Sequence, residues 1–61
     1  MPEYMLVYTF NDEDGKHFSA LFANTSMQMY DVRMDLSCGL GAWVQVYAWD
    51  DDSKEYKFLE E

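Results

Sequence analysis

The chain carries the stretch VYTFNDEDGKHF from Val7 to Phe18, and a closely similar stretch, VYAWDDDSKEY, returns from Val46 to Tyr56. Each copy is an apolar run that ends in an aromatic residue, followed by an acidic turn, a lysine and another aromatic residue. Two β-favouring runs separated by a short turn rich in Asp or Gly are typical of a β-hairpin. The internal repeat therefore predicts two hairpins, both with negative charge at their turns.

The hairpin boundaries follow from the positions of the turn residues. We expect one hairpin over residues 4–23, in which Asp14-Gly15 is a favourable turn pair. A second hairpin is expected over residues 42–59, with the turn at residues 50–54. The four runs that flank these turns are rich in aromatic and β-branched residues, as strands usually are.

The middle segment, residues 24–41, fits two structures. From Tyr30 to Leu36 apolar and charged residues alternate, which is a strand pattern. Thr25 and Gln28 form a capping box, and Gly39 stands where a helix would stop, which is a helix pattern. Signals at both ends favour the helix.

The preferred fold is therefore α+β, with the order ββαββ, in a single small domain of residues 1–61. The helix covers about residues 26–38 and lies on one face of a four-stranded antiparallel sheet made of the two hairpins. Helical spacing would place Met29, Val32 and Leu36 on one stripe. An all-β meander of five strands remains the alternative.

One helix covers only one face of such a sheet, and alternation along the strands sorts the side chains between the two faces. The covered face is expected to hold the smaller or aliphatic residues Met5, Val7, Leu21, Val44, Val46 and Ala48. The open face would then hold Tyr4, Leu6, Tyr8, Phe10, Phe18, Phe22, Trp43, Tyr47, Trp49, Tyr56 and Phe58. Because monomers rarely expose large apolar patches, this arrangement predicts a homodimer or a partner interface. In the alternative arrangement the faces are exchanged and the aromatic residues form the core.

Charge restricts the partners of this chain. Twelve acidic residues face four basic ones, Lys16, Arg33, Lys54 and Lys57, which gives a formal net charge of −8. Direct binding to nucleic acid or to an anionic membrane is disfavoured, since both need lysine and arginine. A basic protein surface is the partner that this charge favours. The alternative is that the acidity only keeps a small apolar protein in solution.

The residue types needed for catalysis or metal binding are scarce. Cys38 and His17 are the only residues of their kinds, so the chain has no internal disulfide and no tetrahedral zinc site. No nucleophile–base pair, phosphate loop or complete calcium loop is present. We therefore expect a protein that is not an enzyme and has no cofactor or metal. Without a signal peptide or a long apolar run, it is expected to be cytoplasmic.

The acidic turns and the aromatic residues are the candidate site. Short connections around an antiparallel helix would place the two turns at opposite ends of the sheet. The candidate acidic contacts are Asp12, Glu13, Asp14, Asp50, Asp51 and Asp52. The candidate anchors, to a target or to a second copy, are Tyr8, Trp43, Tyr47 and Trp49. Tyrosine and tryptophan often dominate the binding energy of protein interfaces.

The acidic hairpin turn Asn11–Lys16, between two strands, is similar to the opening hairpin of a phage uracil-DNA glycosylase inhibitor. Small acidic chains with a hairpin, a helix and further strands also resemble several anti-CRISPR proteins. The resemblance implies an inhibitor that dimerises and occupies the nucleic-acid-binding site of a bacterial defence protein. It assigns no individual residue as a contact.

The leading hypothesis is thus a non-enzymatic inhibitor, encoded by a phage or mobile element, that docks on a basic site of a nucleic-acid-handling protein as a DNA mimic. The alternative is a structural homodimer, or a small subunit of an assembly, in which the acidity serves only solubility. A toxin–antitoxin or other regulatory partner is a third possibility that the sequence does not separate from the first.

Overall fold

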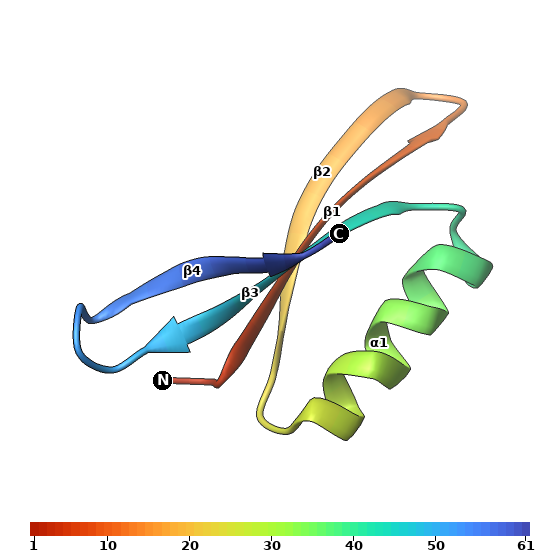
Figure 1. Ribbon diagram of the computed structural model, residues 1–61. Helices are drawn as coiled ribbons and strands as arrows, with labels where there is room; N and C mark the ends of the chain where they lie inside the picture. The colour runs from red at the N-terminus through yellow and green to blue at the C-terminus, as the bar shows by residue number, and fades with distance from the viewer.

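The computed structural model describes the whole chain, residues 1–61, as one antiparallel sheet and one helix. In chain order the elements are β1 (Tyr4–Asp12), β2 (Gly15–Ala23), α1 (Ser26–Gly39), β3 (Trp43–Asp50) and β4 (Glu55–Glu60). The strand order across the sheet is β2-β1-β3-β4, so each hairpin forms one half and β1 pairs with β3 in the middle (Figure 1). The predicted ββαββ fold is confirmed, and the five-stranded meander is wrong.

The start of α1 is fixed by the predicted capping box. Thr25 is extended, with φ −131° and ψ 159°, and its Oγ1 accepts a hydrogen bond of 3.1 Å from the N–H of Gln28. The Gln28 side chain reaches back and accepts a bond of 3.0 Å from the N–H of Asn24. Two N–H groups that would otherwise lack partners are thereby satisfied, which favours the helix over the strand in this segment.

The end of α1 lies within one residue of the predicted end, but the chain turns at a different glycine. Gly39 is still helical, and Leu40 caps the helix in a right-handed conformation. The N–H groups of Leu40 and Ala42 both donate to the carbonyl of Leu36, at 3.2 and 3.1 Å. The residue that leaves the helical conformation is Gly41, with φ 64°, a value that glycine adopts without steric cost. The glycine that turns the chain into β3 is therefore Gly41 rather than Gly39.

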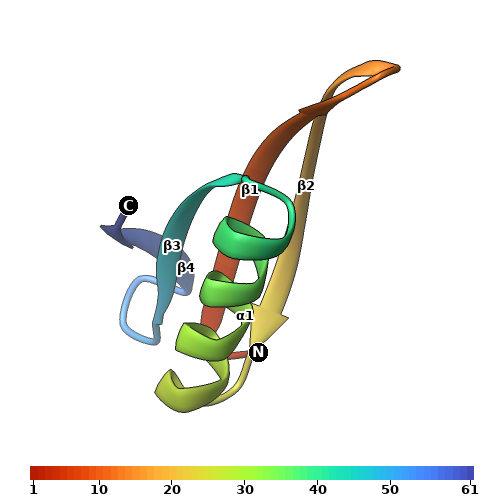
Figure 2. The same cartoon turned by 90° about the vertical axis from the view of Figure 1, so that its right-hand side faces the viewer.

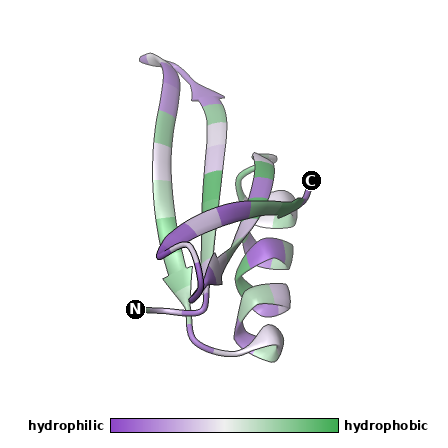
Figure 3. Ribbon diagram, turned by 60° about the vertical axis from the view of Figure 1, so that its left-hand side comes forward, coloured by the Kyte–Doolittle hydropathy of each residue, from purple (hydrophilic) through white to green (hydrophobic).

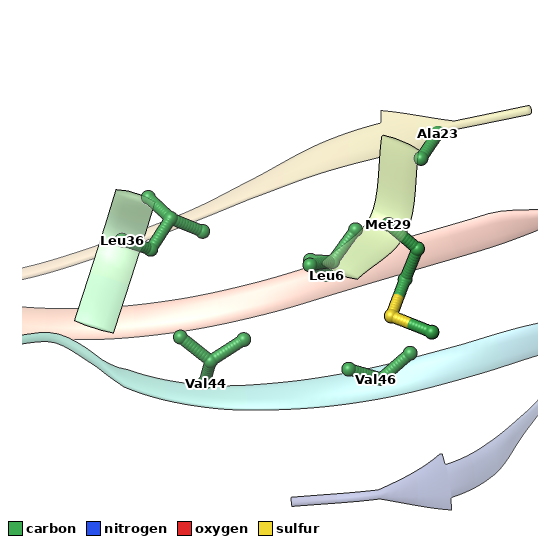
Figure 4. Close-up of a cluster of buried hydrophobic side chains, with 6 residues drawn as sticks. All are labelled: Leu6, Ala23, Met29, Leu36, Val44 and Val46. Carbon is green, nitrogen blue, oxygen red and sulfur yellow. The ribbon is translucent and has the colours of Figure 1, made fainter. Parts of the chain in front are cut away.

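The core lies between α1 and one face of the sheet, which we call the covered face (Figure 2). Figure 4 shows Met29 and Leu36 of the helix facing the side chains of the three strands beneath it. Six residues are buried, each at most 6% exposed: Leu6, Ala23, Met29, Leu36, Val44 and Val46. Such a small core is expected for a chain of this length.

The side chains of β1 that face α1 are the opposite set from the one predicted. Leu6 is fully buried on the covered face, opposite Leu21 of β2 and Val46 of β3. Cross-strand partners share a face, so the even-numbered residues of β1 point towards α1. The prediction was therefore wrong for Tyr4, Leu6, Tyr8 and Phe10, and also for Met5 and Val7. Because β1 is apolar on both sides, its own alternation does not set the phase, and the pairing with β2 and β3 does.

Replacing Thr25 with alanine tests the capping box. Loss of the Oγ1 acceptor should lower the free energy of unfolding by about 1 kcal/mol. Urea denaturation followed by circular dichroism measures this change. Thr25→Ser, which keeps a hydroxyl, is the matched control and should remain close to wild type. Equal losses in both variants would show that the hydroxyl does not cap the helix.

Candidate partner-binding surface

Each acidic turn stands at the tip of a two-stranded arm that projects from the centre of the sheet. Because β3 begins opposite Thr9, the end of β1 from Phe10 to Asp12 pairs with β2 alone. The antiparallel pairing of β1 with β3 places the β3–β4 turn at the opposite end of the molecule, which is 41 Å along its longest axis (Figure 1). Figure 3 shows hydrophilic residues at both turns. The two acidic clusters therefore lie apart, as expected.

At the first tip, Asp12 organises the turn. Its Oδ1 accepts a hydrogen bond of 2.8 Å from the N–H of Asp14, and its Oδ2 lies 2.8 Å from Nε2 of His17. By strict geometry this nitrogen has no hydrogen-bond partner, so the contact is a close approach of the ring nitrogen to the carboxylate. The His17 side chain, helped by the bond from Asp14, holds the pKa of Asp12 below its ordinary value. The His17 ring also stacks on Phe10, with 5.0 Å between ring centroids.

At the second tip, Asp50 has the corresponding role. Its Oδ2 lies 2.9 Å from Nζ of Lys57 and accepts a hydrogen bond of 2.9 Å from Ser53, while its Oδ1 accepts from the N–H of Asp52. Lys57 is the largest cause of a lowered pKa at Asp50, and the same pair raises the pKa of Lys57. Asp51 pairs with Lys54 at 3.1 Å.

Three of the six predicted acidic contacts thus already have a nitrogen partner within the molecule: Asp50 and Asp51 each pair with a lysine, and Asp12 contacts His17. The other three, Glu13, Asp14 and Asp52, are exposed and form no ion pair. The paired carboxylates shape the turns, and the unpaired ones present negative charge outward. Sequence position alone does not distinguish these two groups.

The side of the sheet away from α1, which we call the open face, is covered by no element of the chain (Figure 2). The pairing register assigns to it Met5, Val7, Thr9, Asn11, Lys16, Phe18, Ala20, Phe22, Trp43, Gln45, Tyr47, Trp49, Tyr56 and Phe58. Lys16 is its only charged strand residue. A sheet with one solvated face normally alternates apolar and polar residues, whereas this sheet is apolar on both sides.

The open face exposes a large aromatic area. Phe18 is 74% exposed and Trp43 66%, and Phe22 and Phe58 are each more than half exposed. At 150–250 Å² per aromatic side chain, these four alone leave about 500 Å² uncovered. These four side chains lie on one face of the sheet, where exposed apolar area often marks an interaction site.

Part of the open face is a contiguous aromatic cluster near the second tip. Tyr56 lies 5.0 Å from Trp49 and 6.0 Å from Phe22, measured between ring centroids, and Tyr47 lies 5.7 Å from Phe58. Phe22 and Tyr56 come from the two edge strands, with β1 and β3 between them. Four paired strands would span about 14 Å at 4.7–4.9 Å per step, so the side chains of the twisted sheet converge over this end of the face.

The other part of the open face contains a shallow hollow of about 270 Å³ near the first tip. Phe18 of β2 and Trp43 of β3 lie on opposite sides of Thr9, and Lys16 also lines the hollow. Val7, Thr9 and Gln45 complete the lining. Half of the lining residues are apolar and half are polar, so the hollow suits a partner side chain that has both an apolar and a polar part.

Of the four predicted anchors, Trp43, Tyr47 and Trp49 lie on the open face. Tyr8 does not, because it lies on the covered face, packed against the buried residues and stacked on Phe10 with 6.1 Å between ring centroids. The prediction of Tyr8 as an anchor is wrong, because the even-numbered residues of β1 point towards α1 and not towards the open face. The predicted set missed Phe18, whose position opposite Thr9 places it on the wall of the hollow.

The rest of the molecule meets neither the requirements of a membrane-spanning helix nor those of a metal site. Its helix is not long and apolar enough to cross a membrane. No group of three or more His, Cys, Asp or Glu side chains is placed to hold a metal ion. Cys38 is exposed on α1, with its Sγ 3.6 Å from Sδ of Met34. Comparisons with protein-family models, with curated proteins and with solved structures found no match.

The ion pair at the second tip predicts a pH-dependent stability. The pKa of Asp50 is below 3.8 in the folded protein, so its carboxylate stabilises the fold above that pH, and the contribution is lost as the pH falls through the lowered pKa. Asp50→Asn keeps an acceptor oxygen but removes the charge. The urea midpoint of wild type should exceed that of Asp50→Asn at neutral pH, and the difference should vanish in acid. A difference that stays constant with pH would contradict this assignment.

Because the Phe18 side chain is mostly exposed, we expect it to contribute to contact with a partner and little to the free energy of unfolding. Phe18→Ser should change the free energy of unfolding by no more than about 0.5 kcal/mol, as is usual for surface sites. Leu6→Ala, on the covered face of the neighbouring strand, should cost about 2–5 kcal/mol. Urea denaturation at low protein concentration gives both values. A loss for Phe18→Ser comparable to that for Leu6→Ala would mean that the open face is part of the core.

Proposed function

We propose that this chain is a non-enzymatic acidic protein that inhibits a nucleic-acid-handling protein by occupying its basic site. It would belong to the inhibitors that phages and mobile elements direct against bacterial defences. The observation that supports this most is an uncovered aromatic face with an acidic tip at each end. Desolvated aromatic side chains supply the binding energy, and the carboxylates attract a basic target and speed the encounter.

The two kinds of residue have separate roles in this proposal. Glu13, Asp14 and Asp52 meet lysine and arginine side chains of the target in place of DNA phosphates. Asp12 and Asp50 keep the turns in shape through their hydrogen bonds with the turn backbone. Pre-ordered turns lose little conformational freedom on binding, which favours affinity.

The anchors lie between the tips. Trp43 and Phe18 present the most exposed rings of the open face and both line the hollow, and Tyr47 and Trp49 extend the apolar surface towards the second tip. Direct nucleic-acid binding fits this surface poorly. Stacking platforms need cations along the backbone path, and Lys16 is the only one on the open face.

The test captures a partner from a bacterial lysate on the immobilised chain at low salt. Once identified, the partner is titrated with duplex DNA in the presence and absence of saturating chain. The proposal expects the chain to displace the DNA and its own affinity to fall as salt rises, because charge pairs are screened. A partner that binds DNA equally well with the chain bound would show that the chain is not a DNA mimic.

A pair of charge-reversed variants locates the contact. Glu13→Lys combined with Asp14→Lys should weaken binding to that partner by about tenfold at low salt, which corresponds to about 1.4 kcal/mol. Asp31→Lys combined with Asp35→Lys makes the same change of net charge on exposed positions of α1 and should have a much smaller effect. Equal effects of the two double variants would mean that net charge, and not the tip, controls binding.

The second candidate is a structural homodimer or small assembly subunit, in which the open face is buried and the acidity only keeps the protein dispersed. The internal pairing of Asp12, Asp50 and Asp51 favours it, because these carboxylates are already engaged. A stable dimer that captures no partner from the lysate would support this function over the first.

A further inference from the structure

The two edges of the sheet, β2 and β4, differ in how they are protected. Edge strands present unpaired N–H and C=O groups, and proteins protect them with charged residues, proline or bulges. In β4, Glu55, Lys57 and Glu60 supply charge, and the register with β3 shifts at Val46/Tyr47. In β2, the run Phe18–Ala23 has no charged residue, no proline and no register shift against β1. This edge is therefore open to another strand.

The direction of the free hydrogen-bonding groups follows from the sheet register. The N–H of Trp49 donates to the carbonyl of Glu3 at 2.8 Å, and these residues continue the register in which Tyr4 lies opposite Ala48. Hydrogen-bonded pairs alternate along an antiparallel ladder, so the odd-numbered residues of β1 bond to β3 and the even-numbered ones to β2. In β2 it is therefore the even-numbered residues, Phe18, Ala20 and Phe22, that direct N–H and C=O away from the sheet.

We propose that β2 pairs antiparallel with β2 of a second copy of this chain, about a two-fold axis at Ala20, to form one eight-stranded sheet. In this register Ala20 lies opposite Ala20 of the second copy, and Phe18 lies opposite Phe22. All of these residues carry outward N–H and C=O groups, so each pair can exchange two backbone hydrogen bonds. An interface of this kind is isologous and closes after two copies.

In this arrangement the side chains of β2 in one copy are complementary to those of β2 in the other copy. Phe18 and Phe22 of different copies take opposite positions on the open face, where aromatic cross-strand pairs are favourable, and each Phe22 ring also contacts Tyr56 of its own copy. On the other side, Ser19 meets Leu21, and neither is charged. The open faces of the two copies become one continuous apolar surface. A strand of another protein would match the uncharged side chains and the hydrogen-bonding positions of β2 only by coincidence. A second copy of β2 matches them because the two strands are related by a two-fold axis.

The net charge of −8 does not oppose this contact locally. Lys16 would lie opposite Asn24 of the second copy, so no like charges face each other along the strand. The acidic turn that precedes Lys16 in the chain extends past Asn24 of the second copy and lies beside the start of its α1. The first turn of α1 has no acidic residue of its own, and carboxylates are favourable near a helix N-terminus. This dimer requires no partner and is independent of the proposed function.

The experiment blocks one backbone group without changing a side chain. Chemical synthesis of the 61-residue chain allows N-methylation of Ala20, whose N–H points outward and forms no bond within the sheet. The control is N-methylation of Tyr56, which is opposite Trp49 and also directs its N–H outward, but from the β4 edge. Light scattering should give twice the 7.2 kDa chain mass for the unmodified and Tyr56-methylated chains, and the single mass for the Ala20-methylated chain.

Hydrogen exchange on the unmodified chain provides a second measurement that needs no variant. The amides of Phe18, Ala20 and Phe22 should exchange more slowly as concentration rises, and the amide of Tyr56 should not. A monomeric unmodified chain, a dimer that survives methylation of Ala20, or an Ala20 amide that exchanges as freely as that of Tyr56 would each overturn the proposal.

Discussion

The packing of α1 on one side of the sheet is the interaction on which the rest of the molecule depends. Met29 and Leu36 contact a patch formed by Leu6, Val44 and Val46, and these are five of the six buried residues. Full burial of such a side chain contributes about 1.5–3 kcal/mol before the entropy of ordering is subtracted. Because the core is this small, the free energy of unfolding is small. A single short helix also covers only one face of the sheet. The apolar open face is the direct consequence of that geometry.

Charge and apolar area are segregated in this fold. The hairpins place their acidic turns at the two ends, because β1 and β3 are antiparallel and each turn lies beyond the paired centre. Between the turns, the open face carries rings and almost no charge. Long-range attraction and short-range contact can thus be supplied by different residues, so that one can vary without loss of the other. Such a separation suits a protein that meets a basic partner quickly and then holds it through desolvated aromatic groups.

Much of the fold was predictable because its signals are local. The acidic turns between β-favouring runs predicted the hairpins, and the bonds of Thr25 and Gln28 explain why the helix prevails over the strand-like alternation that follows. The helix ends within one residue of the predicted position, but the glycine that turns the chain could not be chosen in advance, since Gly39 and Gly41 are equivalent by residue type and only the backbone path shows which one needs a positive φ. The acidic residues were identified as a set, but their ion pairs depend on side-chain geometry across the turn and along β4.

The amino-acid sequence by itself determined the two hairpins, the helix between them, the net charge and the excess of aromatic residues, because each depends on neighbours within a few positions. Only the tertiary structure decided which side of β1 faces the helix, since Leu6 and Val7 are equally apolar and the pairing with two other strands selects one. That choice placed Tyr8 on the covered face and left Phe18 on the open one. The edge position of β2 is also a property of the assembled sheet, because strand order depends on contacts between residues far apart in the chain.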